Sequence, residues 1–152
     1  MSEAALSASE SQDLRRIAGI MIPAGGEYGV PGADDPLIFA DIEASLGRDL
    51  DEVRGALATL ARLAGGNFAS LDDARAATVL EQFLATNSTT AAALGRAILQ
   101  CYYRDDRVLT SLGMEPRPPF PKGHTLEQGD WSLLDAVRNR PRLWRDDREA
   151  TR

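Results

Sequence analysis

The chain has 152 residues with a net charge of −6, and its 43% hydrophobic and 26% charged residues are typical of an ordinary folded domain. This acidity argues against an extended basic surface, so nucleic acid is not an expected partner. The chain has one cysteine, Cys101, and one histidine, His124, which excludes a disulfide framework, a Cys/His zinc site and a covalent haem attachment motif. No apolar run approaches the roughly 20 residues that a membrane span needs, so no transmembrane segment is expected.

The N-terminal part of the sequence predicts a frayed end followed by a helix. Residues 1–10 are small and polar, and we expect them to be frayed. A first helix is predicted over residues 11–22, with Ser9 and Gln12 as its capping box. A loop rich in glycine, residues 25–32, follows this helix.

The rest of the chain predicts six further helices, because apolar residues recur at helical spacing between capping residues and glycines. The expected N-caps are Asp35, Asp49, Ser70, Asp106 and Asp130. The predicted helices cover about residues 36–46, 49–64, 70–86, 89–104, 107–112 and 130–137.

No stretch alternates apolar and polar residues with a period of two between hairpin turns, so a sheet is not indicated. The predicted fold is therefore all-α: a single irregular helical bundle over residues 11–113. Residues 114–152 are expected to form an extended proline-rich segment plus a short C-terminal helix in the same domain. With prolines at 116, 118, 119 and 121, this segment should be largely polyproline II and should need a surface to hold it.

Several patterns could carry chemistry, and each has a simpler structural interpretation. Cys101 and His124 could pair as nucleophile and base, but Cys101 lies on an apolar helix face and His124 has no obvious orienting carboxylate. The glycines of residues 25–32 could approach a phosphate, but such loops follow a strand, and here a helix precedes the loop. We therefore expect no catalytic and no cofactor-binding residue in this chain.

Three pairs of neighbouring aspartates could suggest a metal site or general acid/base catalysis. Helix capping is the favoured interpretation, because carboxylates stabilise helix N-termini. No metal site is therefore expected. The pairs are Asp34-Asp35, Asp72-Asp73 and Asp105-Asp106.

Two adjacent tyrosines near the end of the fifth helix point about 100° apart, so one should enter the core and the other should face outwards. An exposed Tyr103 would lie near Arg104 and Arg107, and tyrosine with arginine is a composition favoured at binding hot spots. For Trp131 and Trp144, core packing and partner contact are equally favoured.

Three groups of residues, in this order and spacing, resemble the gluconate 2-dehydrogenase subunit 3 family over most of the chain. The first is Arg16-Ile17-Ala18 through Ile22-Pro23-Ala24, with Pro31-Gly32-Ala33; the second is Tyr102-Tyr103-Arg104-Asp105-Asp106-Arg107-Val108, with Leu112-Gly113; the third is Pro119-Phe120-Pro121-Lys122-Gly123-His124, with Leu133-Leu134-Asp135-Ala136-Val137-Arg138. Family members are small, non-catalytic subunits of dehydrogenases whose large subunit is a flavoprotein of the glucose-methanol-choline (GMC) oxidoreductase type.

The resemblance implies that this chain is not itself an enzyme but binds, and stabilises or chaperones, a large subunit that carries FAD and acts on CH–OH groups of a sugar or alcohol. A cytochrome c subunit is a further candidate partner. No cofactor is expected in this chain. The expected partner-binding residues are Tyr103, Arg107, Pro119, Phe120, Lys122 and His124.

Many members of the family carry a twin-arginine signal before the first helix. Here Arg15-Arg16 aligns inside that helix, so a cytoplasmic complex is expected, with a periplasmic one as the alternative. The alternative function is a stand-alone helical binding or regulatory protein that self-associates or holds a small ligand between its helices.

Overall fold

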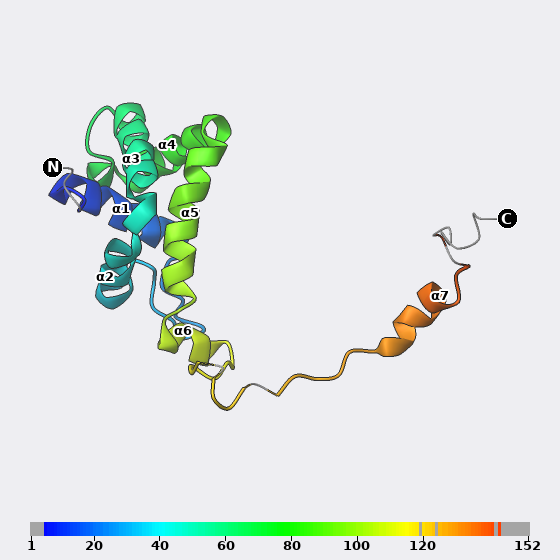
Figure 1. The fold of residues 1–152 in the computed structure, drawn as a ribbon. Coiled ribbons are helices and arrows are strands. Elements are labelled where there is room, and N and C mark those ends of the chain that lie inside the picture. The colour runs from blue at the N-terminus through cyan, green and yellow to red at the C-terminus, as the bar shows by residue number, and fades with distance from the viewer. Residues whose placement is uncertain (1–4, 119, 124, 142, 144–152) are drawn as a thin grey trace. The chain divides into compact units, whose positions relative to one another are not determined.

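The computed structural model describes residues 5–118, 120–123, 125–141 and 143, and over these residues the fold is all-α, as predicted (Figure 1). An isolated bridge between Gly25 and Val30 is the β pairing within the described part. The chain divides into a first unit, Met1–Pro116, and a second unit, Arg117–Arg152, each of which we describe by itself. The helices are α1 (Ala8–Met21), α2 (Pro36–Ser45), α3 (Leu50–Ala64), α4 (Asp73–Thr86), α5 (Ser88–Tyr102), α6 (Asp106–Ser111) and α7 (Asp135–Arg138), with short 3-10 helices η1 (Gly47–Asp49), η2 (Phe68–Ser70) and η3 (Trp131–Leu134).

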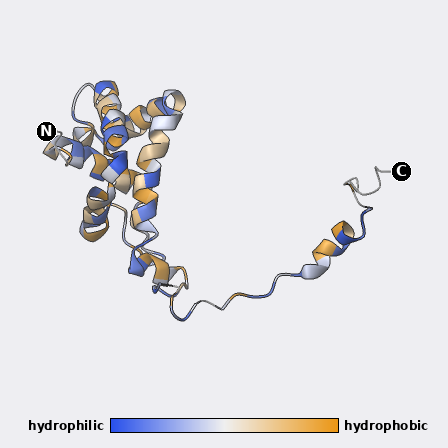
Figure 2. Ribbon diagram, viewed as in Figure 1, coloured by the Kyte–Doolittle hydropathy of each residue, from blue (hydrophilic) through white to orange (hydrophobic). Residues whose placement is uncertain are grey.

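Helix α5 runs along one side of the first unit and packs against α2, α3 and α4 (Figure 1). Its buried face was predicted correctly, since Leu94, Ile98 and Cys101 are all at most 4% exposed. Hydrophobic residues occur along much of the length of this helix (Figure 2). The largest fully buried side chains of the first unit are Leu14, Ile38, Ile42, Leu57, Leu60, Phe68, Phe83 and Ile98.

Helix α1 begins earlier than the sequence suggested. The capping box is made by Ser7 and Glu10, and not by Ser9 and Gln12: the Glu10 amide donates to Ser7 Oγ at 3.3 Å, and the Ser7 amide donates to Glu10 Oε2 at 2.8 Å. The bond to the Ser7 backbone lowers the pKa of Glu10. Because this reciprocal pair satisfies two amides that the helix leaves open, the helix starts at Ala8, inside the stretch expected to fray.

Helix α4 begins after Ser70 rather than at it. The side chain of Asn67 accepts a bond from the Ala69 amide and closes η2 as a separate turn, while Ser70 Oγ donates to the Asn67 carbonyl. Asp72 then caps α4 by accepting from the Arg75 amide at 2.8 Å. The Ser70 side chain therefore bonds within η2 and does not cap α4.

Other helix ends follow the same local chemistry. The cap of α6 is Asp105, one residue before the predicted Asp106, because the Asp105 side chain accepts from the Arg107 amide. Gly65 ends α3 as predicted, in the left-handed conformation with φ 75°. Helix α5 ends at Tyr102, two residues before the predicted end at residue 104.

Within the part of the first unit that the structure describes, one acidic side chain is buried. Asp13 on α1 is 3% exposed, and its Oδ1 accepts a bond from the Ala69 amide of η2 at 2.7 Å. A buried carboxylate needs such a donor, because leaving it unpaired would cost several kcal/mol. This bond fixes η2, and with it the buried Phe68, against α1.

The described residues of the second unit include a turn within the proline-rich segment. Residues 120–122 form a turn, and Arg117 Nη2 donates to the Gly123 carbonyl at 2.6 Å across it. Gly123 has φ 67°, which turns the chain again.

The C-terminal helix was predicted correctly at its start, where Asp130 caps η3 by accepting from the Ser132 amide at 3.0 Å. Helix α7 follows η3 directly. Hydrophobic residues are prominent on this short helical segment (Figure 2), and Trp131, Leu133 and Val137 are all more than half exposed. Trp144 lies outside the described residues. Within the described chain, no helix has both the length and the apolar character to cross a lipid bilayer.

We predict that Phe68→Ala lowers the free energy of unfolding by about 3–5 kcal/mol, because it removes a fully buried ring from the core. Urea denaturation followed by circular dichroism measures this loss. Leu37→Ala is the control, because Leu37 is 70% exposed and its truncation should change stability by about 0.5 kcal/mol or less. Equal losses in the two variants would contradict the position of Phe68 in the core.

Candidate partner-binding surface

The structure places the predicted partner-binding residues in two different units. Tyr103 follows α5 and Arg107 lies on α6, so both belong to the corner between these helices. Phe120, which is 84% exposed, and Lys122, also exposed, belong to the second unit. Pro119 and His124 lie outside the described residues. Among the predicted residues that the structure describes, Tyr103 and Arg107 therefore belong to the same corner.

The two tyrosines at the end of α5 have different environments, as predicted. Tyr102 is 5% exposed and Tyr103 is 53% exposed. Their rings meet edge to face, with centroids 5.3 Å apart, which is a favoured aromatic geometry. The Tyr102 hydroxyl donates to the Pro31 carbonyl at 3.3 Å. The buried ring thus supports the exposed one and joins α5 to the loop between α1 and α2.

This loop, residues 22–35, is closed on itself. The Ala33 amide donates to the Ile22 carbonyl at 2.9 Å, so both ends of the loop meet. Gly32 lies in the crossing: a Cβ there would come within 2.9 Å of the Ala24 amide nitrogen. Only glycine fits this position. The closed loop therefore holds the Pro31 carbonyl where it accepts the bond from Tyr102.

A shallow pocket of about 220 Å³ lies between this loop and α6. Tyr28 and Val30 line it from the loop, Tyr102 and Tyr103 from the end of α5, and Leu112 from the end of α6. We call Tyr28, Tyr103 and Leu112 the α6 patch, because they are respectively 72%, 53% and 57% exposed around one pocket. Exposed aromatic and aliphatic side chains around a pocket are typical of a protein-binding surface.

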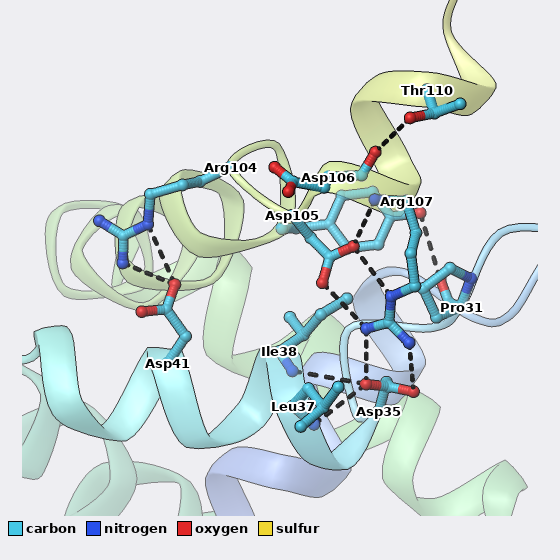
Figure 3. A network of polar contacts seen from close by, with 11 residues as sticks. Pro31, Asp35, Leu37, Ile38, Asp41, Arg104, Asp105, Asp106, Arg107 and Thr110 are labelled. Atoms are coloured by element: carbon cyan, nitrogen blue, oxygen red, sulfur yellow. Dashed lines mark hydrogen bonds and ion pairs between the residues drawn. The ribbon is translucent and has the colours of Figure 1, made fainter. Parts of the chain in front are cut away.

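Arg107 fixes the position of α6 relative to α2 (Figure 3). Its Nη2 donates to Asp35 Oδ1 at 2.8 Å and to Asp105 Oδ2 at 2.9 Å, and its Nε donates to Asp105 Oδ1 at 3.0 Å. Asp35 and Asp105 are also the N-caps of α2 and α6. One guanidinium therefore joins the N-termini of two helices that are distant in sequence.

The protonation states in this network follow from the same contacts. The Arg107 guanidinium lowers the pKa of Asp35 and the pKa of Asp105, and the two carboxylates raise the pKa of Arg107. All three groups are therefore charged at neutral pH. Because Arg107 already bonds two carboxylates of its own chain, its predicted role in binding a partner stays a prediction.

A second arginine on the same corner connects α5 with α2. Arg104 Nη2 donates to Asp41 Oδ2 at 2.6 Å and to Ser45 Oγ at 2.7 Å. The same Nη2 lies 3.6 Å from the sulfur of Cys101. Burial is nevertheless the main influence on Cys101 and raises the pKa of its thiol, which disfavours the nucleophilic thiolate.

The acidic pairs act as helix caps, as interpreted from the sequence. Asp35, Asp72 and Asp105 each accept a bond from a backbone amide in the first turn of a helix. Among the described residues, no group of three or more His, Cys, Asp or Glu side chains could hold a metal ion.

The loop of residues 25–32 connects two helices, and Gly29 in it has φ 63°.

Comparison of the chain with protein-family models, with curated proteins and with solved structures gave no match. The resemblance drawn from the sequence motifs therefore stays a prediction, and the candidate surface rests on the geometry above.

We predict that Arg107→Gln destabilises the protein at neutral pH and that this effect fades in acid. The variant leaves the carboxylates of Asp35 and Asp105 facing each other without a cation. In the native protein both pKa values lie below the ordinary value of about 3.8, so the stabilisation is complete above pH about 5 and is lost as the pH falls through the lowered values. Urea midpoints measured between pH 7 and about pH 2.5 test this.

Arg62→Gln, at an exposed position on α3, is the matched control and should show no such dependence on pH. A gap between Arg107→Gln and the native protein that stays constant down to the lowest pH would contradict the proposed network.

Proposed function

We propose that this chain is the non-catalytic small subunit of a GMC-type, FAD-dependent dehydrogenase and that it stabilises or chaperones the large flavoprotein subunit. The main support for this proposal is that the α6 patch lies at the corner between α5 and α6. Residues 102–108, which carry part of the family resemblance, form the corner at which Tyr103 is exposed. The segment that carries part of the resemblance is therefore also one that exposes an aromatic side chain, Tyr103.

The α6 patch has the chemistry of a protein contact rather than of a reaction site. Tyr28 and Tyr103 present large rings with a hydroxyl, which combine apolar area with a polar end and lose little rotamer freedom on binding. Leu112 adds an aliphatic side chain beside them. In the proposed complex these residues bury their surface against the large subunit, which supplies FAD and the active-site base for oxidation of a CH–OH group.

The corner is also held rigidly enough for docking. The edge-to-face contact with Tyr102 and the bonds of Arg107 to two helix caps fix the backbone on both sides of Tyr103. A surface that is ordered before binding loses less conformational entropy when a partner arrives. The second unit contributes Phe120 and Lys122 as further expected contacts, both exposed in the chain by itself.

We predict that this chain increases the yield of flavin-loaded, active large subunit when the two are expressed together, because it covers surface that the flavoprotein otherwise exposes. The measurement compares soluble protein, flavin absorbance and dehydrogenase activity of a GMC-type large subunit from the same genome with and without this chain. Copurification of the two chains in a fixed ratio is the expected result. An equally soluble, flavin-loaded and active large subunit without this chain would disprove the proposal.

We predict that Tyr103→Ser and Phe120→Ser each weaken the complex by about tenfold or more, since truncating a buried aromatic at an interface costs about 2 kcal/mol. The dissociation constant of the two purified subunits measures the effect. Leu84→Ser is the control for Tyr103, because Leu84 is similarly exposed at 57% but lies on α4 and not on the α6 patch. If Leu84→Ser weakened the complex as much as Tyr103→Ser, the α6 patch would not be the docking surface.

A further inference from the structure

A second pocket lies on a different part of the first unit, between α1, α4 and α5. Its volume is about 330 Å³, and all nine residues that line it are hydrophobic or glycine. Phe83 and Leu94 form its buried wall, and Met21, Leu80 and Gly95 also line it. No lining side chain carries a charge or a hydrogen-bonding group, so the pocket offers contacts to apolar atoms alone.

The glycine in this wall has no explanation within the chain. Gly95 lies in the middle of α5, where glycine is about 1 kcal/mol less favourable than alanine. A Cβ at this position would lie 3.8 Å from Met21 Cε, an ordinary contact, with no closer neighbour. Gly95 is also absent from the glycines with positive φ. Because Gly95 has no side chain, the backbone of α5 is exposed to the pocket at this position.

The size of the apolar region favours a small molecule over a protein partner. Ile20, Met21 and Leu84 are the lining side chains with large exposure, at 39%, 42% and 57%. A stable protein interface uses about 20–30 residues on each side, far more than this mouth provides. Pockets for small ligands, in contrast, begin at about 300 Å³.

We propose that this pocket binds a small apolar ligand with an uncharged alkyl chain, which packs against Met21, Phe83 and the open backbone at Gly95. Burial of alkyl groups stabilises such a complex by roughly 0.8 kcal/mol per methylene. A charged group would gain no partner inside and would have to remain at the mouth. This inference is independent of the proposed assembly, because the pocket and the α6 patch share no residue.

The test uses the full chain labelled with ¹³C at its methionine methyl groups, titrated with 1-octanol and followed by NMR. The chain has three methionines, and Met21 is the one that lines the pocket. The methyl signal of Met21 should shift and saturate, while that of Met114, beyond the end of α6, should stay constant. The melting temperature should rise with octanol concentration, because ligand binding stabilises the folded state.

Two variants test the pocket, one by filling it and the other by placing a charge at its mouth. Gly95→Leu should fill it and abolish the saturable shift of Met21, whereas Gly55→Leu, at an exposed helical glycine of α3 with open space around its Cβ position, should leave binding unchanged. Leu84→Glu places a charge at the exposed mouth and should weaken octanol binding by about tenfold or more. If Gly95→Leu does not fold, the Leu84→Glu result decides.

Three results would overturn the proposal: a shift that does not saturate, equal shifts at Met21 and Met114, or undiminished binding by the pocket variants. A Met21 signal that moves with protein concentration instead of octanol would assign the pocket to self-association and would also overturn it. Octylammonium and octanoate complete the series. Both should bind more weakly than octanol, and tighter binding of either would contradict the uncharged chemistry inferred from the lining.

Discussion

The corner that carries the α6 patch depends on one arginine, Arg107, which bonds the capping aspartates of two helices. Each of Asp35 and Asp105 caps its helix by accepting from backbone amides, and a carboxylate is favourable there because of the helix dipole. Two such negative charges near each other would repel. Arg107 removes that repulsion and converts it into charge-assisted bonds. The relative position of α2 and α6 follows from this pairing.

The loop of residues 22–35 and the end of α5 are arranged around this joint. Asp35 ends the loop, Pro31 accepts from Tyr102, and Gly32 allows the loop to cross itself closely. The exposed Tyr28 and Tyr103 are therefore presented from two segments that are each fixed to the same framework. The apolar pocket at Gly95 lies at the middle of α5, so one helix supports two surfaces of different chemistry.

The features that the sequence predicted correctly are those determined by neighbouring residues. The apolar face of α5 and the ends at Asp35, Gly65 and Asp130 each depend on a few adjacent positions. The errors at Ser9 and Ser70 arose because several polar residues nearby could serve as cap, and their relative energies differ by less than about 1 kcal/mol.

The parts of the candidate surface that the sequence did not indicate depend on contacts between distant segments. Tyr28 lies in a loop with no periodicity, and its position beside Leu112 follows from the folded loop alone. Likewise, Arg107 and Asp35 are 72 residues apart, so no local pattern connects them. Tyr103 could be predicted, because the 100° step along a helix separates it from the buried Tyr102.

The joint at Arg107 also constrains how this sequence can diverge. Replacing the arginine alone leaves two carboxylates without their shared cation, and replacing either aspartate alone removes a helix cap and one partner of the arginine. Positions 35, 105 and 107 should therefore covary in related chains. A chain that loses the arginine at position 107 should also lose the acidic residue at position 35 or 105, and a chain that keeps the arginine should keep at least one of them. Such covariation would trace the α2–α6 joint through divergent relatives even where overall sequence similarity has faded.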